Sequence, residues 1–238
     1  MKSKTNYIGI NQRVPFDVLD EAIQLFLKSG PINRAYIIGR MQEYNAGINR
    51  ATKAATYLFQ ILNSQEKILD LFKKDLKDSD YQSLRIEERK VFCLCLICLK
   101  YPITYDLLVA LAQTFKVQDQ INKRLLIEKV KFKYGGNRTV DVAIDALVPM
   151  IIELNTIIRE KVGLYSKAMP VVVKNKFISE LIIYTDISLS GSKSILSDDL
   201  AVKPWFSYFE IDNKNLVKFN VLIERKESVV GKGYLYKL

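Results

Sequence analysis

One stretch decides the fold of this 238-residue chain: NKRLLIEKVKFKYGGNRTVDVAIDALVP, residues 122–149. Its first half is strongly basic and sets apolar residues at helical spacing, and Gly135 and Gly136 then allow the positive φ that ends helices. A further helix begins at Asn137 and carries apolar residues on one face until Pro149, which must end or kink it. The stretch therefore predicts a helix, a short glycine turn and a second helix, which is the order of a DNA-binding helix-turn-helix.

The same order of features occurs earlier in the chain, in NRAYIIGRMQEYNAGINR, residues 33–50. Both copies run from Asn and basic residues through an apolar helical pattern to Tyr, Gly and a final Asn-Arg. In the earlier copy, the helix that begins at Asn49 has an apolar face opposite a basic and amide-bearing stripe. Such a stripe can contact phosphates and base edges in a major groove. It consists of Arg50, Lys53, Tyr57 and Gln60.

The later copy has a less suitable outer face but more basic surroundings. Its second helix carries Asp141 and Asp145, whose charges phosphate would repel. Residues 116–138, however, contain seven Lys or Arg. The following TIIREKVGLYSKAMPVVV, residues 156–173, has β-branched runs on either side of a basic middle, which indicates a hairpin or wing. A basic helix, a helix-turn-helix and a basic wing are what a winged-helix domain needs to straddle a groove and its flanking phosphates.

We therefore predict a non-enzymatic protein that binds double-stranded DNA through tandem helix-turn-helix units and a wing. Base contacts are expected near Arg50 and Lys53, and most of the phosphate attraction is expected from residues 123–167. Single-stranded DNA or RNA stays open, because Tyr57, Tyr134 and Tyr165 can stack on bases as easily as pack inside. The predicted DNA-contacting residues are Arg34, Arg40, Asn49, Arg50, Lys53, Tyr57, Gln60, Lys123, Arg124, Lys129, Lys131, Lys133, Asn137, Arg138, Thr139, Arg159, Lys161 and Lys167.

The composition supports a polyanionic partner and excludes many enzymes. Lys and Arg total 36 against 26 Asp and Glu, a formal net charge of +10, which favours nucleic acid or an anionic membrane surface. The chain contains no histidine, so it has no histidine general base, no Ser-His or Cys-His nucleophile pair and no histidine zinc ligand. We expect no cofactor.

A cysteine-containing segment, VFCLCLICL at residues 91–99, is apolar all round, as in a helix surrounded by other helices. Its three cysteines, Cys93, Cys95 and Cys98, are expected to pack in the core rather than to form disulfides or bind zinc. The segment is too short to cross a bilayer, and the amino terminus has no secretory signal pattern. We therefore expect a cytoplasmic protein without a membrane partner.

One enzymatic alternative stays open. Glu224 and Lys226 follow an apolar strand, and Asp212 lies upstream, a pattern that resembles the Mg²⁺ site of restriction-type nucleases. Only twelve residues follow the motif, too few for the helices that surround such a site. A second alternative is a protein-interaction subunit whose helices pack in a larger assembly and whose charge provides solubility.

Patterning predicts a mainly α-helical chain with three parts. Residues 1–100 form a helical domain with the first helix-turn-helix, and residues 101–176 form the second unit with its wing. Residues 177–238 form a mixed α/β extension. Within it, residues 177–187 fit helix or strand, residues 188–199 are a Ser-rich loop, and the chain from Trp205 onward suggests a small antiparallel meander.

Three segments together resemble the BrxA family of BREX phage-defence systems: QEYNAGINRATKAATYLFQIL, IEERKVFCLCLICLKYPITYDLL, and GGNRTVDVAIDALVPMIIELNTI with the wing-like GLYSK. The resemblance covers about residues 30–175 in topology and motif order. It implies a helical core with a winged-helix part, binding of double-stranded DNA, no catalysis, and work beside other proteins of a multi-component defence system. The chain after residue 176 has no counterpart in this pattern.

Overall fold

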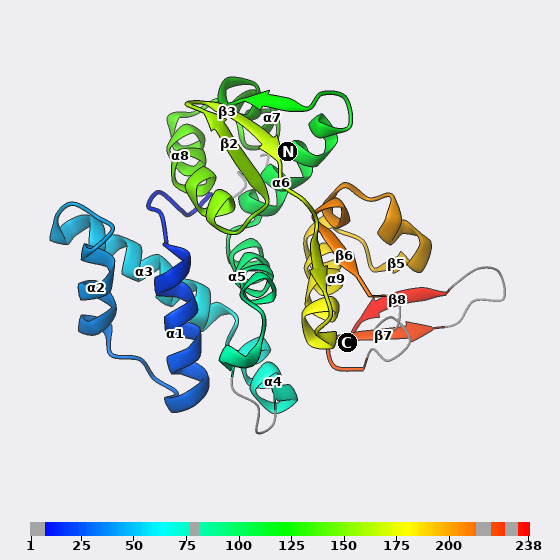
Figure 1. Ribbon diagram of the computed structural model, residues 1–238, viewed down its shortest axis with the longest axis horizontal. Coiled ribbons are helices and arrows are strands. Elements are labelled where there is room, and N and C mark those ends of the chain that lie inside the picture. The colour runs from blue at the N-terminus through cyan, green and yellow to red at the C-terminus, as the bar shows by residue number, and fades with distance from the viewer. Residues whose placement is uncertain (1–7, 77–80, 213–219, 227–232) are drawn as a thin grey trace, which may run out of the picture.

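The computed structural model describes residues 8–76, 81–212, 220–226 and 233–238. Within them the chain is mainly helical, with small sheets in its second half, two of them antiparallel and one parallel. Figure 1 shows helix α5 (Ile86–Lys100) at the centre, with three groups of elements around it. One hydrophobic core runs through all three groups.

The first group consists of α1 (Phe16–Ser29), α2 (Arg34–Gln42), α3 (Ile48–Ser64), α4 (Glu66–Leu76) and the short 3₁₀ helix η1 (Tyr81–Ser83). Helix α2 begins where the side chain of Asn33 accepts hydrogen bonds from two backbone N–H groups. Gly47, with φ of 89°, immediately precedes α3. The buried face of α3 includes the small residues Ala51, Ala54 and Ala55, which let neighbouring helices approach closely. The two helices predicted within residues 33–63 are thus present as α2 and α3.

Helix α5 forms the centre of the core, as its composition predicted. Its residues from Val91 to Cys98 are all buried, and the three cysteines are free thiols. Helix α6 (Pro102–Phe115) follows immediately, since a proline is well suited to a first helical position. Among the described residues, no single helix has the length and hydropathy to cross a membrane; α5 and α6 reach that threshold only as a pair, bent by 115°.

The second group follows α6 in the order β1 (Gln120–Asn122), α7 (Lys123–Tyr134), α8 (Arg138–Glu153), β2 (Ile157–Lys161) and β3 (Leu164–Lys167). The three strands form an antiparallel sheet in the order β1-β3-β2. Figure 1 shows α8 beside the β2–β3 hairpin at the top of the molecule.

Two details in this group differ from expectation. Pro149 does not end the helix, because α8 continues to Glu153. The proline has no N–H to donate to the carbonyl of Asp145, which is an exposed residue. The predicted wing also extended too far. Its second strand is β3, whereas residues 171–173 form a separate strand, β4 (Val171–Val173), outside the hairpin.

The third group contains α9 (Lys176–Ser190), β5 (Ser194–Leu196), the 3₁₀ helices η2 (Ser197–Ala201) and η3 (Pro204–Tyr208), β6 (Phe209–Ile211), β7 (Ile223–Lys226) and β8 (Tyr234–Lys237). The ambiguous residues 177–187 are therefore helical, and the predicted Ser-rich loop includes β5. The sheet β5-β8-β7 is antiparallel, as predicted, but it is not a meander of the chain after Trp205, because β5 pairs with β8 and β6 lies outside the sheet. Strand β6 pairs in parallel with β4 instead. The predicted breaks at Asn213, Glu227 and Ser228 lie outside the described residues.

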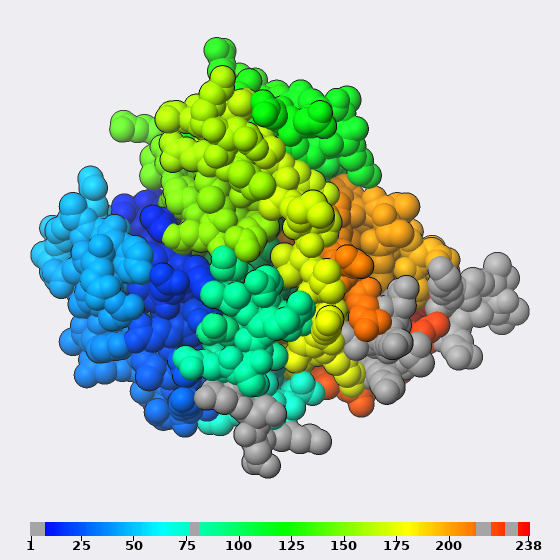
Figure 2. Space-filling model, in the orientation of Figure 1, coloured from blue at the N-terminus to red at the C-terminus, as the bar shows by residue number. Residues whose placement is uncertain are grey.

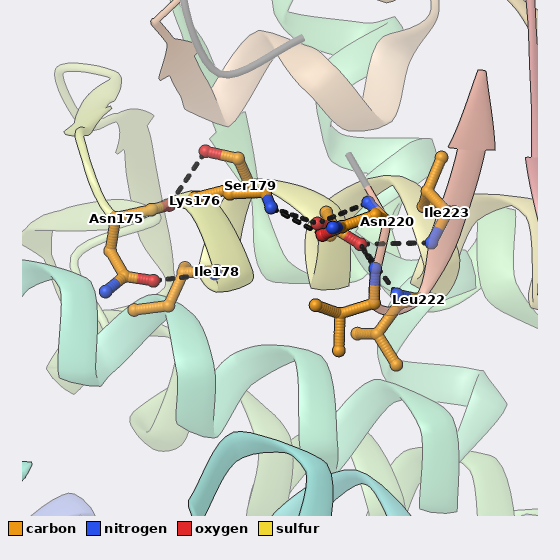
Figure 3. Close-up of polar contacts among 9 residues, drawn as sticks. Asn175, Lys176, Ile178, Ser179, Asn220, Leu222 and Ile223 are labelled. Carbon is orange, nitrogen blue, oxygen red and sulfur yellow. Dashed lines mark hydrogen bonds and ion pairs between the residues drawn. The ribbon is translucent and has the colours of Figure 1, made fainter. Parts of the chain in front are cut away.

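Two buried carboxylates hold α9 in place. Glu180, fully buried on α9, accepts backbone hydrogen bonds from residues 220–223, including that of Leu222 at 2.6 Å (Figure 3). Glu88 on α5 accepts the backbone N–H groups of Lys174 and Asn175 at 2.6 and 2.7 Å, next to the start of α9. These bonds join the C-terminal strands to α9, and α9 to the central helix.

Candidate nucleic-acid interface

The amino-terminal end of α7 is fixed against the hairpin turn. The side chain of Asn122 accepts a hydrogen bond from the backbone N–H of Leu125 at 2.8 Å and so caps α7. The backbone N–H of Lys123 donates to the carbonyl of Gly163 at 2.9 Å. The turn between β2 and β3 is thereby placed beside the first turn of a basic helix.

A three-residue turn joins α7 to α8. Gly135 takes a φ of 86°, which ends α7, and Asn137 caps α8 by accepting the backbone N–H of Thr139 at 2.8 Å. Arg138 and Thr139 are exposed at the start of α8, where the sequence placed them. The caps and the glycine explain why both helix boundaries were predictable from the sequence.

The acidic side chains on the outer face of α8 are neutralised by lysines of α7. Lys123 pairs with Asp145 at 2.5 Å, and Lys131 pairs with Asp141 at 2.7 Å. These two aspartates were expected to repel phosphate. Because each faces a lysine, the outer face of α8 is close to neutral, and the two lysines have less charge to offer a ligand.

Most other predicted cations of this unit stay exposed. Arg124 pairs with Glu128 at 3.2 Å on the same helix, and Lys133 pairs with Asp106 of α6 at 2.6 Å. Exposed pairs of this kind are weak and readily exchange partners. The structure records no carboxylate partner within the described residues for four predicted cations: Lys129, Arg138, Arg159 and Lys161.

A cavity of about 400 Å³ lies between α8 and the hairpin. Its wall includes Arg13, Lys123 and Arg159, together with Asp145 and Glu153. Three cations converge there from the amino-terminal segment, α7 and β2. In the space-filling view, the surface of α7, α8 and the hairpin forms one end of the molecule (Figure 2).

Lys167 lies at the other end of the hairpin, in a less exposed position. Its ammonium group is 5.5 Å from the ring centroid of Tyr208. Burial, followed by the nearby charge of Lys116, lowers the pKa of Lys167. The Lys116 side chain donates to the carbonyl of Val202 at 3.2 Å. These two lysines form a second, smaller positive region of the same unit.

In the first predicted unit, formed by α2 and α3, only part of the predicted DNA-contacting stripe on α3 is exposed. The rest contacts other residues of the protein. Asn49, Arg50 and Lys53 are exposed on the first turns of α3. The hydroxyl of Tyr57 donates to Asn11 at 2.8 Å, and the side chain of Gln60 accepts from a tyrosine of the α5–α6 junction. Tyr57 and Gln60 therefore face the body of the protein.

The two predicted arginines of α2 are also engaged. Arg34 donates to the hydroxyl of Thr56 at 2.7 Å, and its guanidinium lies 5.4 Å from the ring centroid of Phe59. Arg40 forms ion pairs with Glu21 and Glu43. The accessible cations of the first unit are thus those at the start of α3 and Arg34, which is exposed and has no carboxylate partner among the described residues.

The residues of the nuclease alternative lie near the C-terminus. Glu224 and Lys226 are both on β7 and pair with each other at 3.4 Å. Asp212 follows β6, and its backbone N–H donates to the carbonyl of Val173. The described part of the chain contains no group of three or more His, Cys, Asp or Glu residues arranged to hold a metal ion.

One exposed residue was missed by the sequence analysis. Phe132 on α7 is 96% exposed. The buried residues of α7, Leu126 and Val130, are four apart, so the next inward position falls near residue 134. That spacing places Phe132 on the outer side and could have identified it.

Comparisons of the chain with protein-family models, curated proteins and solved structures found no match. The resemblance to the BrxA family therefore rests on the sequence motifs alone.

Proposed function

We propose that this chain is a non-enzymatic protein that binds double-stranded DNA through the unit from α6 to β3. One observation carries the proposal: the unit has the order helix, strand, helix, helix and hairpin, with its first strand paired to its last. This is the order of a winged-helix domain. In such a domain α8 is the recognition helix in the major groove and the β2–β3 hairpin is the wing.

The charge distribution supports phosphate contacts more than base contacts. Arg138 at the start of α8 and Arg159 and Lys161 on the hairpin surround a helix whose own aspartates are already paired. Cations that contact phosphates give affinity without sequence information. We therefore expect binding with weak sequence preference. The first unit adds a second contact through Asn49, Arg50 and Lys53.

The proposal is tested by fluorescence anisotropy with a short duplex over a range of salt concentrations. Each phosphate contact that depends on a cation should add about −0.9 to the slope of log affinity against log salt. The variant with Arg138, Arg159 and Lys161 all changed to Ala should bind less tightly and with a smaller slope. The matched control changes Lys67, Lys73 and Lys193 to Ala, which removes the same charge from exposed positions outside this unit.

Three outcomes would contradict the proposal. Equal loss of affinity in both triple variants would mean that net charge, and not this surface, attracts DNA. Absence of binding at low salt would favour the protein-interaction subunit. Cleavage that requires Mg²⁺ and is lost in Glu224→Ala would instead support the nuclease.

From the resemblance to the BrxA family, we further propose that the chain binds DNA beside larger proteins of a phage-defence system.

A further inference from the structure

The ring of Phe132 stands free on the outer side of α7. At 96% exposure it is the most exposed large apolar side chain in the described part of the chain. Lys131 and Lys133 lie on either side of it in the sequence. The fold does not use this ring, because Leu126 and Val130 supply the buried face of the helix.

The residues next to Phe132 contact the two neighbouring helices. On one flank, Lys131 pairs with Asp141 of α8 at 2.7 Å. On the other flank, Lys133 and the hydroxyl of Tyr134 both bond to Asp106 of α6 at 2.6 Å. These bonds join the end of α7 to α6 and α8, and position 132 stays on the outer side of the helix.

The surroundings of the ring suit a polyanion with flat apolar faces. Lys129 lies one turn before it without a carboxylate partner among the described residues, and Arg138 begins the next helix. The nearest acidic residue along the helix, Glu128, is paired with Arg124. The other exposed side chains of α7 are charged, so a single ring offers too little apolar area for a protein interface or for membrane insertion.

We propose that Phe132 stacks on an unpaired base, and that the preferred ligand is a DNA duplex with a single-stranded overhang or fork. This inference rests on the DNA binding proposed above. In a continuous duplex the faces of the bases are covered by their neighbours, whereas an unpaired base offers a face for an aromatic side chain. The duplex lies on α8 and the hairpin, and the unpaired strand passes over α7.

The test compares a blunt duplex with the same duplex carrying an overhang that contains 2-aminopurine. The wild-type protein should bind the overhang about tenfold more tightly, since stacking of one base contributes about that factor. Phe132→Ala should lose this preference while its affinity for the blunt duplex and the salt slope stay unchanged. Phe132→Tyr should keep the preference, and Phe132→Leu should lose it because it is apolar but not flat. The 2-aminopurine fluorescence should be quenched by wild type and Phe132→Tyr alone.

Two controls separate stacking from other effects. Val117→Ala removes another highly exposed apolar side chain, outside α7, and should behave as wild type. Lys129→Ala should weaken binding of both DNAs and reduce the salt slope.

Several results would overturn the inference. If both DNAs bind but wild type and Phe132→Ala show the same ratio of overhang affinity to blunt-duplex affinity, this inference alone is removed. No binding of either DNA would remove the proposed function as well. If Phe132→Leu prefers the overhang as strongly as wild type does, the side chain at position 132 makes a general apolar contact and does not stack. A wild-type dimer in sedimentation that Phe132→Ala dissociates would assign the ring to a second copy of the chain.

Discussion

Glu88 is a single residue on which the position of α9 depends. Its carboxylate, 4% exposed, receives two backbone N–H groups and a hydrogen bond from Arg85 at 3.3 Å. Burial alone would raise the pKa of Glu88, but the bond from Arg85 and the two N–H groups outweigh it, and the pKa lies below its usual value. The charged form is therefore the one that the folded protein stabilises.

We expect Glu88→Ala to lower the free energy of unfolding by about 2 kcal/mol, because two buried N–H groups lose their acceptor. The neighbouring Glu87→Ala, at an exposed position, is the matched control and should have little effect. Urea unfolding at neutral pH measures both.

Glu88 also makes the free energy of unfolding depend on pH, in a direction that follows from its lowered pKa. A carboxyl whose pKa is lower in the folded state adds stability above its unfolded pKa, and this stability is lost as the pH falls through the folded pKa. The difference between wild type and Glu88→Gln should therefore be largest at neutral pH and shrink below about pH 4. A difference that grows in acid would contradict this assignment.

The role of Glu88 could not be predicted from the sequence, whereas the helix caps could. The caps Asn33, Asn122 and Asn137 act on N–H groups within three residues, so local pattern was enough to identify the helices that they begin. Glu88 bonds to groups 86 and 87 residues away, and no local pattern distinguishes it from a solvated charge.

At the scale of elements, the turn between α7 and α8 determines how the two helices meet. Gly135 has a positive φ of 86°, and Gly136 does not have a positive φ, although both have open space around them. Gly135→Ala should cost about 1 kcal/mol because Ala is strained at that φ. Gly136→Ala is the matched control and should stay within about 0.5 kcal/mol of wild type. Thermal unfolding of the two variants gives the comparison, and equal costs would show that the backbone conformation is not the cause.

Helices with one buried face were predictable from their apolar spacing, whereas α9, which is buried on most sides and contains buried polar residues, was not. Helices α3 and α8 bury one face, so their apolar spacing identified them. Most of α9 is buried, including Ser179, Glu180 and Asp186, so its periodicity is lost and the segment fitted helix or strand equally. The parallel pairing of β4 with β6 joins segments almost forty residues apart, which no hairpin pattern indicates.

For the whole molecule, Glu180 determines whether the C-terminal strands stay attached. Its carboxylate is the shared acceptor for the backbone of residues 220–223. In Glu180→Ala, hydrogen exchange of the amides of Val221, Leu222 and Ile223 should be about tenfold faster or more, while the amides of α5 keep their protection. Glu210→Ala, an exposed position on β6, is the control. Uniform loss of protection across the molecule would mean that this contact stabilises the whole fold.

The overall charge of the candidate interface could be predicted, but its distribution could not. The excess of Lys and Arg in residues 116–167 is evident from the sequence. Whether a given lysine faces solvent or a carboxylate depends on how α7 packs on α8, as the pairs Lys123–Asp145 and Lys131–Asp141 show. Likewise Tyr57 was predicted to contact DNA from its position on the helix. Its hydrogen bond to Asn11 was not predictable, because Asn11 lies in a segment that precedes α1.

The three cysteines of α5 have a practical consequence. All are fully buried; burial raises the pKa of Cys95 to about 12 and raises those of Cys93 and Cys98 as well. Thiol reagents react with exposed thiolates, so they reach these residues only when the centre of the molecule opens. A cysteine introduced on α7 or on the hairpin can therefore carry a fluorophore or a spin label in the otherwise unaltered chain, and modification of the native thiols then reports the rate at which the core opens.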